Sequence, residues 1–257
     1  MRRKCGVDGW PRWMLGCLVI GGVLMAGSVS GEELTFMSYN ICAGKGMDGK
    51  RDLTRAAEVI KRGQAEWVAV QEVDRKTRRS FGADQPAELE RMTGLHATYG
   101  KTIDFQGGAY GILLLSKEKP IASKVVPLLS KFENRALLVV EFERLVMCVT
   151  HLSLDAKERL DAIPLIYDAV KGYTKPVFIA GDWNDRPDSE TLKAMRKHFT
   201  VLTDEKASTF PAPDPNQCID YIAVDNVHAP TFKVVSRAVV AEPLASDHRP
   251  ITLTVRR

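Results

Sequence analysis

A series of short apolar runs between residues 34 and 255 constrains this chain more than any other feature. The runs are four to eight residues long and rich in Val, Ile and Leu, which is typical of buried strands. Nine strands are expected, at 34–41, 67–70, 111–116, 136–142, 145–152, 177–180, 221–224, 231–235 and 251–255. So many strands are best accommodated in two sheets that pack face to face.

Helical patterns alternate with these runs. Asp52 can cap a helix that presents an apolar face from Leu53 to Ile60. Further helices are expected at 85–93, 155–170 and 189–199. Pro164 lies inside the second of these three, so that helix is expected to be bent or broken there.

The spacing of two strands predicts how they pair. Only two residues separate 136–142 from 145–152, which favours an antiparallel hairpin and argues against a purely parallel sheet. We therefore predict an α/β fold of four layers, with two mixed, largely antiparallel sheets packed together and helices on the outside.

Residues 1–30 differ in character from the rest of the chain. Basic residues precede an apolar run from Met14 to Ala26, and small residues follow it. This order is typical of a secretory signal peptide, and the run is short for a bilayer span, which needs about 20 apolar residues. We expect a cleaved signal peptide, with an uncleaved N-terminal anchor as the alternative. Residues 31–257 would then form one domain in the periplasm or outside the cell.

The net charge and the cysteines of that domain limit what it can be. Without residues 1–30, which hold four basic residues and one acidic, the formal net charge falls from +4 to +1. Proteins that bind duplex nucleic acid usually carry a basic excess, so the near-neutral domain weakens that substrate class without excluding it. Cys42, Cys148 and Cys218 have no CxxC spacing and are expected to be small buried hydrophobic residues, with one disulfide and a spare thiol as the alternative.

Polar side chains gather at the ends of the predicted strands. Each alone has an ordinary structural explanation, such as a turn or a cap. Together they indicate one polar cleft, because loops at strand ends can converge on a rigid scaffold. The residues are Asn40, Glu72, His151, Asp182, Asn184, Asp220, Asp247 and His248.

Three of these residues suit a metal ion. The oxygens of Glu72, Asp247 and Asn40 fit a hard cation such as Mg²⁺ or Mn²⁺, which binds phosphate oxygens and keeps part of its water. Zinc is less favoured, because the sequence has no HExxH motif and no Cys/His cluster. A divalent cation of this kind stabilises charge when water attacks a phosphate ester.

The other residues suit the handling of protons and water. His248, held by Asp220, can move protons near neutral pH. Asp182 and Asn184 can orient the attacking water. His151 can hydrogen-bond the phosphate or act as a second acid–base group.

Nine motifs occur in the order found in the endonuclease/exonuclease/phosphatase superfamily: MSYNI, VQEV, GGAYGILLLS, ENRALLVVEF, VTHL, IAGDWND, STFP, IDYI and SDHRP. The chain resembles this superfamily from about residue 34 to residue 254. The resemblance implies a DNase-I-like fold and a divalent-metal-dependent phosphoesterase. It implies that Glu72 is the principal metal ligand, beside Asn40 and Asp247.

The resemblance also implies roles for the remaining residues. Asp182 aligns or deprotonates water, with Asn184 as its positioning partner and a phosphate contact, while His151 faces the scissile phosphate. Arg135 is similar to an arginine that contacts phosphate, although a surface charge at a strand edge is the alternative. Tyr110 is either a phosphate contact or a packing residue. Thr209, a weaker candidate, is expected to support the cleft.

The motifs leave the substrate open, because one scaffold serves many reactions. Residues 100–110 and 203–218 are expected to form the rim, and they contain neither a Lys/Arg cluster nor an exposed aromatic hairpin. The basic run from Arg75 to Arg79 is either a solvated loop or a contact for a distal phosphate. The segments KRDLTRAAEVIK and QEVDRKTRRS are similar to a bacterial secreted branch related to GPI-anchor lipid remodelling proteins.

Three functions follow as hypotheses. The first is a nuclease-like hydrolase of phosphodiesters or phosphomonoesters. The second is a phosphodiesterase or phosphatase acting on lipid headgroups, GPI-like substrates or inositol phosphates. The third is a catalytically inactive binding module, which the intact set of polar residues disfavours. No feature indicates a protein partner, and a monomer is expected.

Overall fold

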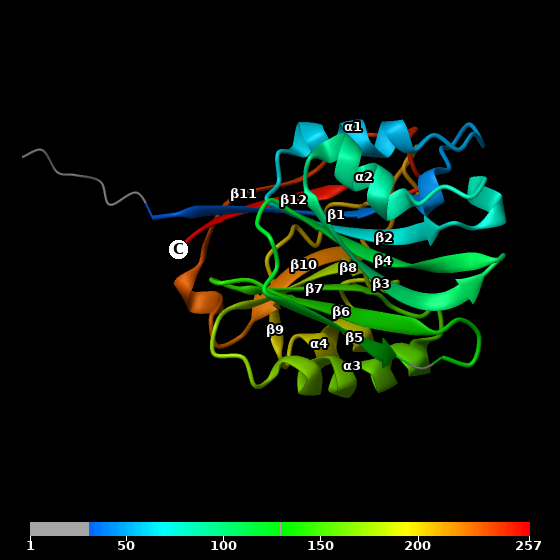
Figure 1. Ribbon diagram of the computed structural model, residues 1–257. Helices are drawn as coiled ribbons and strands as arrows, with labels where there is room; N and C mark the ends of the chain where they lie inside the picture. The colour runs from blue at the N-terminus through cyan, green and yellow to red at the C-terminus, as the bar shows by residue number, and fades with distance from the viewer. Residues whose placement is uncertain (1–30, 129) are drawn as a thin grey trace, which may run out of the picture. The chain divides into compact units, whose positions relative to one another are not determined.

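The computed structural model describes residues 31–128 and 130–257 (Figure 1). The predicted signal peptide, residues 1–30, lies outside the described residues. Within the described part of the chain, no helix is long and apolar enough to cross a membrane.

The strands form two sheets, as the sequence predicted, and each sheet has six strands. Sheet 1 contains, in spatial order, β11 (Lys233–Val239), β12 (Ile251–Arg256), β1 (Glu33–Asn40), β2 (Trp67–Arg75), β4 (Gly108–Ser116) and β3 (His96–Phe105). Sheet 2 contains β5 (Ala122–Leu128), β6 (Arg135–Glu141), β7 (Val146–His151), β8 (Val177–Asp182), β10 (Asp220–Asp225) and β9 (Phe199–Val201). The central pairs β1–β2 and β7–β8 are parallel, and the other neighbours are antiparallel.

Aromatic residues fill the space between the two sheets. Phe36 of sheet 1 stacks on Trp67, with ring centroids 5.3 Å apart, and on Phe178 of sheet 2 at 4.4 Å. These three side chains are fully buried, so the contact between the sheets is a dry, close-packed core.

Helices cover the outer faces of both sheets (Figure 1). α1 (Leu53–Gly63) and α2 (Gln85–Thr93) pack on sheet 1, and α3 (Ala156–Val170) and α4 (Glu190–Met195) pack on sheet 2. Asp52 caps α1 by accepting a hydrogen bond from the Thr54 N–H at 3.0 Å. The predicted four-layer arrangement is therefore confirmed.

Two helix predictions need correction. α3 is not broken at Pro164, which was one of the two outcomes expected there; Pro164 is exposed, so water can satisfy the carbonyl that loses its helical partner. α4 ends at Met195 and not at Phe199, because Phe199 is buried as the start of β9 and pairs with Asp225 of β10.

The strands that were not predicted lie at sheet edges. β3 and β5 are edge strands with mostly half-buried or exposed residues, and β9 has only three residues. Such strands lack the continuous apolar run that marks a buried strand. The predicted hairpin of β6 and β7 is antiparallel, as expected.

The cysteines do not form disulfides within the described residues. Cys148 and Cys218 are buried, as predicted for small hydrophobic side chains, and Cys42 is half-buried.

The topology directs several strand ends to one edge of the molecule. The parallel strands β7 and β8 end together, with His151 opposite Asp182. β10 runs antiparallel to β8, so its first residue, Asp220, also lies opposite Asp182. β1 ends at Asn40 on the facing sheet, beside the β2 segment that carries Glu72.

Candidate active site

Glu72 lies at an irregular point of β2. Its φ of 59° belongs to the left-handed region, and the register with β4 shifts between Val70 and Val73. A bulge of this kind re-aims a side chain. Here it brings the Glu72 carboxylate to the cleft, where Asn40 Nδ2 donates a hydrogen bond to Oε1 at 3.1 Å.

Asn40 connects the two sheets. Its side-chain nitrogen donates to Glu72 and also to Asp182 Oδ2 of sheet 2, at 3.2 Å. Its side-chain oxygen accepts the Cys42 N–H at 3.1 Å. The amide therefore holds the two carboxylates in place. Its oxygen accepts one hydrogen bond and keeps a second lone pair, so metal binding by Asn40 stays a prediction.

Asp247 supplies a second carboxylate to the part of the cleft that Glu72 lines. The preceding residue, Ser246, donates to the Asn40 carbonyl at 2.7 Å and to Asp247 Oδ1 at 3.2 Å, which fixes the loop before β12 against β1. Burial raises the pKa of Glu72, the Asn40 hydrogen bond lowers it, and the nearby Asp247 raises it. Because the Asp247 charge opposes the ionisation of Glu72, the two carboxylates fit a hard divalent cation, which would relieve their repulsion.

Asp182, His248 and Asp220 form a buried row. His248 Nδ1 lies 2.9 Å from Asp220 Oδ2, and His248 Nε2 lies 3.5 Å from Asp182 Oδ2. Thr209 Oγ1 also donates to Asp220 Oδ2, at 2.6 Å, which supports this side of the cleft.

Two members of the row, His248 and Asp182, have shifted pKa values. Burial opposes charge on His248, but Asp220 and Asp182 outweigh it and raise its pKa to about 10. Burial raises the pKa of Asp182, although His248 lowers it. One ligand atom from each of the three residues lies within 4.8 Å of the others, close enough to hold a cation. His248 lies between the two carboxylates and within reach of both, so we interpret the row as the proton-handling part of the site.

His151 has the opposite character. Its Nδ1 accepts from Arg135 Nη1 at 3.1 Å, and its Nε2 lies 3.5 Å from Asp182 Oδ2. Burial, with Arg135 and His248, lowers the pKa of His151 well below its ordinary value. Because arginine can only donate, the neutral ring carries its proton on Nε2 and can donate it toward the cleft.

Asn184 is fixed by its backbone and its amide. Its φ is 52°, its N–H donates to Asp182 Oδ1 at 2.9 Å, and Nδ2 donates to the Leu152 carbonyl at 2.9 Å. The side-chain oxygen thus remains the free hydrogen-bonding group of this amide, beside Asp182.

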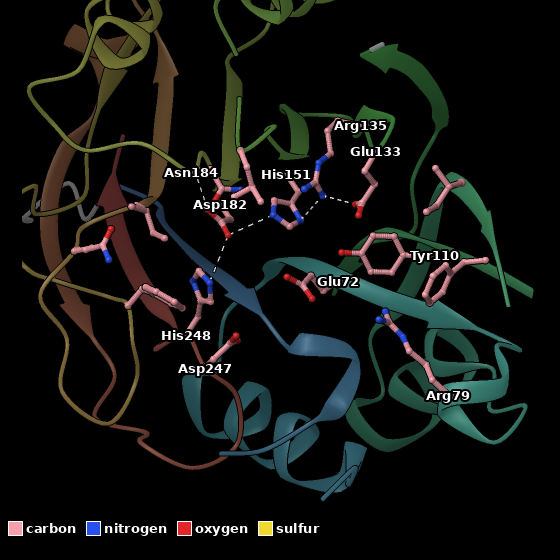
Figure 2. Close-up of a pocket in the computed structure, with 16 residues that line it drawn as sticks. Glu72, Arg79, Tyr110, Glu133, Arg135, His151, Asp182, Asn184, Asp247 and His248 are labelled. Carbon is pink, nitrogen blue, oxygen red and sulfur yellow. Dashed lines mark hydrogen bonds and ion pairs between the residues drawn. The ribbon is translucent and has the colours of Figure 1, made fainter. Parts of the chain in front are cut away.

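These side chains surround a cleft of about 520 Å³ (Figure 2). Eight predicted residues line it: Glu72, Tyr110, Arg135, His151, Asp182, Asn184, Asp247 and His248. Asn40 and Asp220 lie behind them. Both predicted rim segments contribute, through Phe105 and Tyr110 in one and Phe210 and Gln217 in the other.

Two charged lining residues were not assigned to the site from the sequence. Glu133 pairs with Arg135 Nη1 at 2.7 Å, and Arg79 lies beyond Tyr110. Glu133 stands two residues before Arg135 in the ENRALL motif, and Arg79 belongs to the basic run, so both lay in segments already noted. Burial raises the pKa of Tyr110, so its hydroxyl stays protonated and can donate.

Solved structures share this fold. An endonuclease/exonuclease/phosphatase from Beutenbergia cavernae DSM 12333 matches with a TM-score of 0.71 and 22% identity, covering 87% of this chain and 71% of that one. A mannosyl-6-phosphatase from Bacteroides thetaiotaomicron VPI-5482 gives 0.66 and 16%, covering 87% and 100%. The human Nocturnin catalytic domain with bound sulfate anion gives 0.64 and 19%, covering 87% and 94%. At these identities the likeness shows the fold alone.

Sequence comparison identifies the family. No curated protein matches the chain significantly. Residues 37–248, however, match the family model described as the Endonuclease/Exonuclease/phosphatase family. Because this match spans most of the 257 residues and agrees with the fold, the chain belongs to the Endonuclease/Exonuclease/phosphatase family.

Proposed function

We propose that this protein is a divalent-metal-dependent phosphoesterase that hydrolyses a compact phosphate ester by activating water. One observation carries the proposal: a paired-carboxylate site and a buried Asp–His–Asp row face the same cleft. Neither group alone is specific for phosphoester hydrolysis. Side by side, they supply the two requirements of the reaction, which are charge stabilisation and proton transfer.

Glu72 and Asp247 would hold the cation, Mg²⁺ or Mn²⁺. When bound, the cation would stabilise negative charge on the phosphoryl and leaving oxygens. Asn40 holds the Glu72 and Asp182 carboxylates in position by donating a hydrogen bond to each.

The other residues act on the phosphate and the water. Asp182, whose pKa is raised by burial, would take the proton of a water oriented by the Asn184 amide. His151, neutral and protonated on Nε2, would donate to a phosphate oxygen, together with Arg135 and the Tyr110 hydroxyl. His248 would stabilise the negative charge that develops beside Asp182.

The cleft favours a compact ester over a duplex. Its volume is in the range typical of small-molecule sites. Its two arginines, Arg79 and Arg135, are each paired with a carboxylate, so neither provides a free charge for a long phosphate backbone. The mannosyl-6-phosphatase shows that this fold can accommodate a sugar phosphatase.

Nuclease activity is the second candidate. Lys76 and Lys131 are exposed, lie on loops that reach the cleft, and have no ion pair within the described residues. They could contact a single strand outside the cleft. Lipid headgroups remain a third substrate class to test.

A substrate panel with metal removal tests the proposal. Residues 31–257 would be assayed with Mg²⁺ or Mn²⁺ on bis-p-nitrophenyl phosphate, sugar phosphates, inositol phosphates, sphingomyelin and plasmid DNA, each repeated with EDTA. We expect EDTA-sensitive release from the small esters and intact plasmid. Glu72→Ala should weaken metal binding measured by calorimetry, whereas His248→Ala should abolish turnover and leave metal binding nearly unchanged. Plasmid nicking alone would favour the nuclease, and inactivity on every substrate would favour a binding module.

We also propose that the protein is exported, because residues 1–30 have the layout of a signal peptide. Mass spectrometry of the protein purified from its host tests this. A chain that begins near residue 31 supports export with cleavage, and a chain that keeps residues 1–30 in the membrane fraction supports an anchor.

A further inference from the structure

The cleft extends past Tyr110, away from Asp182, to a second group of residues (Figure 2). Arg79 and Phe105 line this distal end, and Glu133 lies between it and Arg135. Tyr110 thus separates the expected phosphate position from Arg79. None of the steps proposed above uses the distal end.

A buried network fixes Arg79 in place. Its Nε and Nη2 each donate to Asp74 at 2.8 Å, one to each carboxylate oxygen. Asp74 is fully buried and also accepts hydrogen bonds from Thr77 at 2.8 Å and Ser80 at 2.5 Å. Arg79 is therefore not a mobile surface cation, unlike its exposed neighbour Arg78.

The fixed guanidinium lies over two aromatic rings. Its central carbon is 4.6 Å from the ring centroid of Phe105 and 5.2 Å from that of Tyr110. Among the described residues, the remaining nitrogen, Nη1, has no hydrogen-bond partner. A rigid donor of this kind loses little side-chain entropy when it binds a ligand.

The charges at this end cancel. Asp74 offsets Arg79, and Glu133 offsets Arg135. A second phosphate would find no unbalanced cation here and would be repelled by Glu133. An uncharged group that accepts a hydrogen bond, such as a hydroxyl or carbonyl oxygen, avoids both penalties.

We propose that Arg79, Phe105 and Tyr110 form a specificity subsite for the organic substituent of the phosphate ester, and that Arg79 Nη1 donates to an uncharged oxygen of that substituent. This inference rests on the proposed phosphoesterase function. It assigns the Asp74 network a positioning role, because that network orients Arg79 and does not itself reach the cleft.

Competition between phosphate ligands tests the subsite. Hydrolysis of bis-p-nitrophenyl phosphate with saturating Mg²⁺ would be inhibited by inorganic phosphate, glycerol 3-phosphate or pyrophosphate. All three contain a phosphate. Inorganic phosphate has no substituent, glycerol 3-phosphate carries an uncharged diol, and pyrophosphate carries a second, charged phosphate. Arg79→Ala is the test variant, and Arg78→Ala is the matched control, since Arg78 is adjacent, exposed and outside the cleft.

We expect Arg79→Ala to raise the inhibition constant of glycerol 3-phosphate about tenfold, the value of one lost hydrogen bond from a charged donor. The constant for inorganic phosphate should change less than twofold, and Arg78→Ala should change neither. Arg79→Lys controls for misfolding, because it keeps a cation beside the buried Asp74. A lysine cannot contact both oxygens of Asp74 and also reach the substituent. It should lose glycerol 3-phosphate affinity as Arg79→Ala does.

Three results would overturn the inference. They are an equal loss for inorganic phosphate, the largest loss for pyrophosphate, and no change in any constant for either Arg79 variant. If the wild-type protein shows no hydrolysis, the proposed function itself fails and the subsite fails with it. Turnover with no effect of Arg79 rejects the subsite alone.

Discussion

Replacing Asp220 by Asn tests the electrostatics of the buried row. The change keeps the shape of the side chain and lets Thr209 still donate to an oxygen, but it removes the charge 2.9 Å from His248 Nδ1. A pKa raised from 6.5 to about 10 corresponds to about 5 kcal/mol in favour of the protonated ring. Without Asp220, burial opposes that charge and only Asp182, at 3.5 Å, supports it.

We therefore expect the pKa of His248 in Asp220→Asn to fall to its ordinary value or below. Because its pKa is raised, the wild-type His248 ring stays charged throughout the neutral pH range, whereas the variant ring loses its proton there. Imidazole ¹⁵N chemical shifts measured from pH 5 to 10 would report this directly, since the chain has only five histidines. The hydrolysis rate at neutral pH should fall by about 10²–10³-fold, the usual cost of losing one group that stabilises charge in the transition state.

Asp225→Asn is the matched control. Asp225 ends β10 and pairs with His228 at 2.9 Å, so this change removes an equivalent carboxylate–imidazole contact away from the cleft. It should leave the His248 titration and the hydrolysis rate unchanged. A His248 that still titrates above pH 9 in Asp220→Asn would refute the electrostatic account of the row.

Three further predictions concern stability. Phe36→Ala removes the ring between Trp67 and Phe178, and urea titration should show a loss of about 3–5 kcal/mol. Asn40→Leu removes the hydrogen bonds to both carboxylates and should lower the free energy of unfolding by about 1–3 kcal/mol in EDTA. Added Mg²⁺ should partly restore it if the site holds metal. Equal stability of the wild type and the variant would contradict the role of Asn40. Glu158 accepts hydrogen bonds from two serines and one backbone N–H, which lower its pKa to about 2. The stability advantage of the wild type over Glu158→Gln should be complete above pH 4.5 and disappear as the pH falls toward 2, as followed by the melting temperature.

The sequence predicted the central strands better than the edge strands, for a physical reason. β7 and β8 are buried on both faces, so each is a continuous apolar run that stands out in the sequence. β3 and β5 have one exposed face and a free edge, and their composition is close to that of a loop. Their position is fixed by pairing with β4 and β6, and pairing is not visible in the strand itself.

In the candidate site too, some features could be predicted from the sequence and others could not. Polar residues at strand ends could be found from the sequence, because the apolar runs mark where strands stop. The orientation of Asn40 could not, since it depends on carboxylates 32 and 142 residues away. The contact between Arg79 and Asp74 could not be predicted either, because nothing in the five residues of the basic run indicates that one arginine points inward.

The division of the site between the two sheets has a consequence for how activity responds to damage. Glu72 and Asn40 belong to sheet 1, and Asp247 lies on the loop that leads into β12 of that sheet, while Asp182, His151 and Asp220 belong to sheet 2. The Asn40–Asp182 and His248–Asp220 contacts cross between them. A small slip at the Phe36–Phe178 contact would therefore separate the reacting groups while every strand stayed intact. Turnover of the proposed substrate would then decline before secondary structure melts, so an activity assay would measure how well the two sheets are aligned.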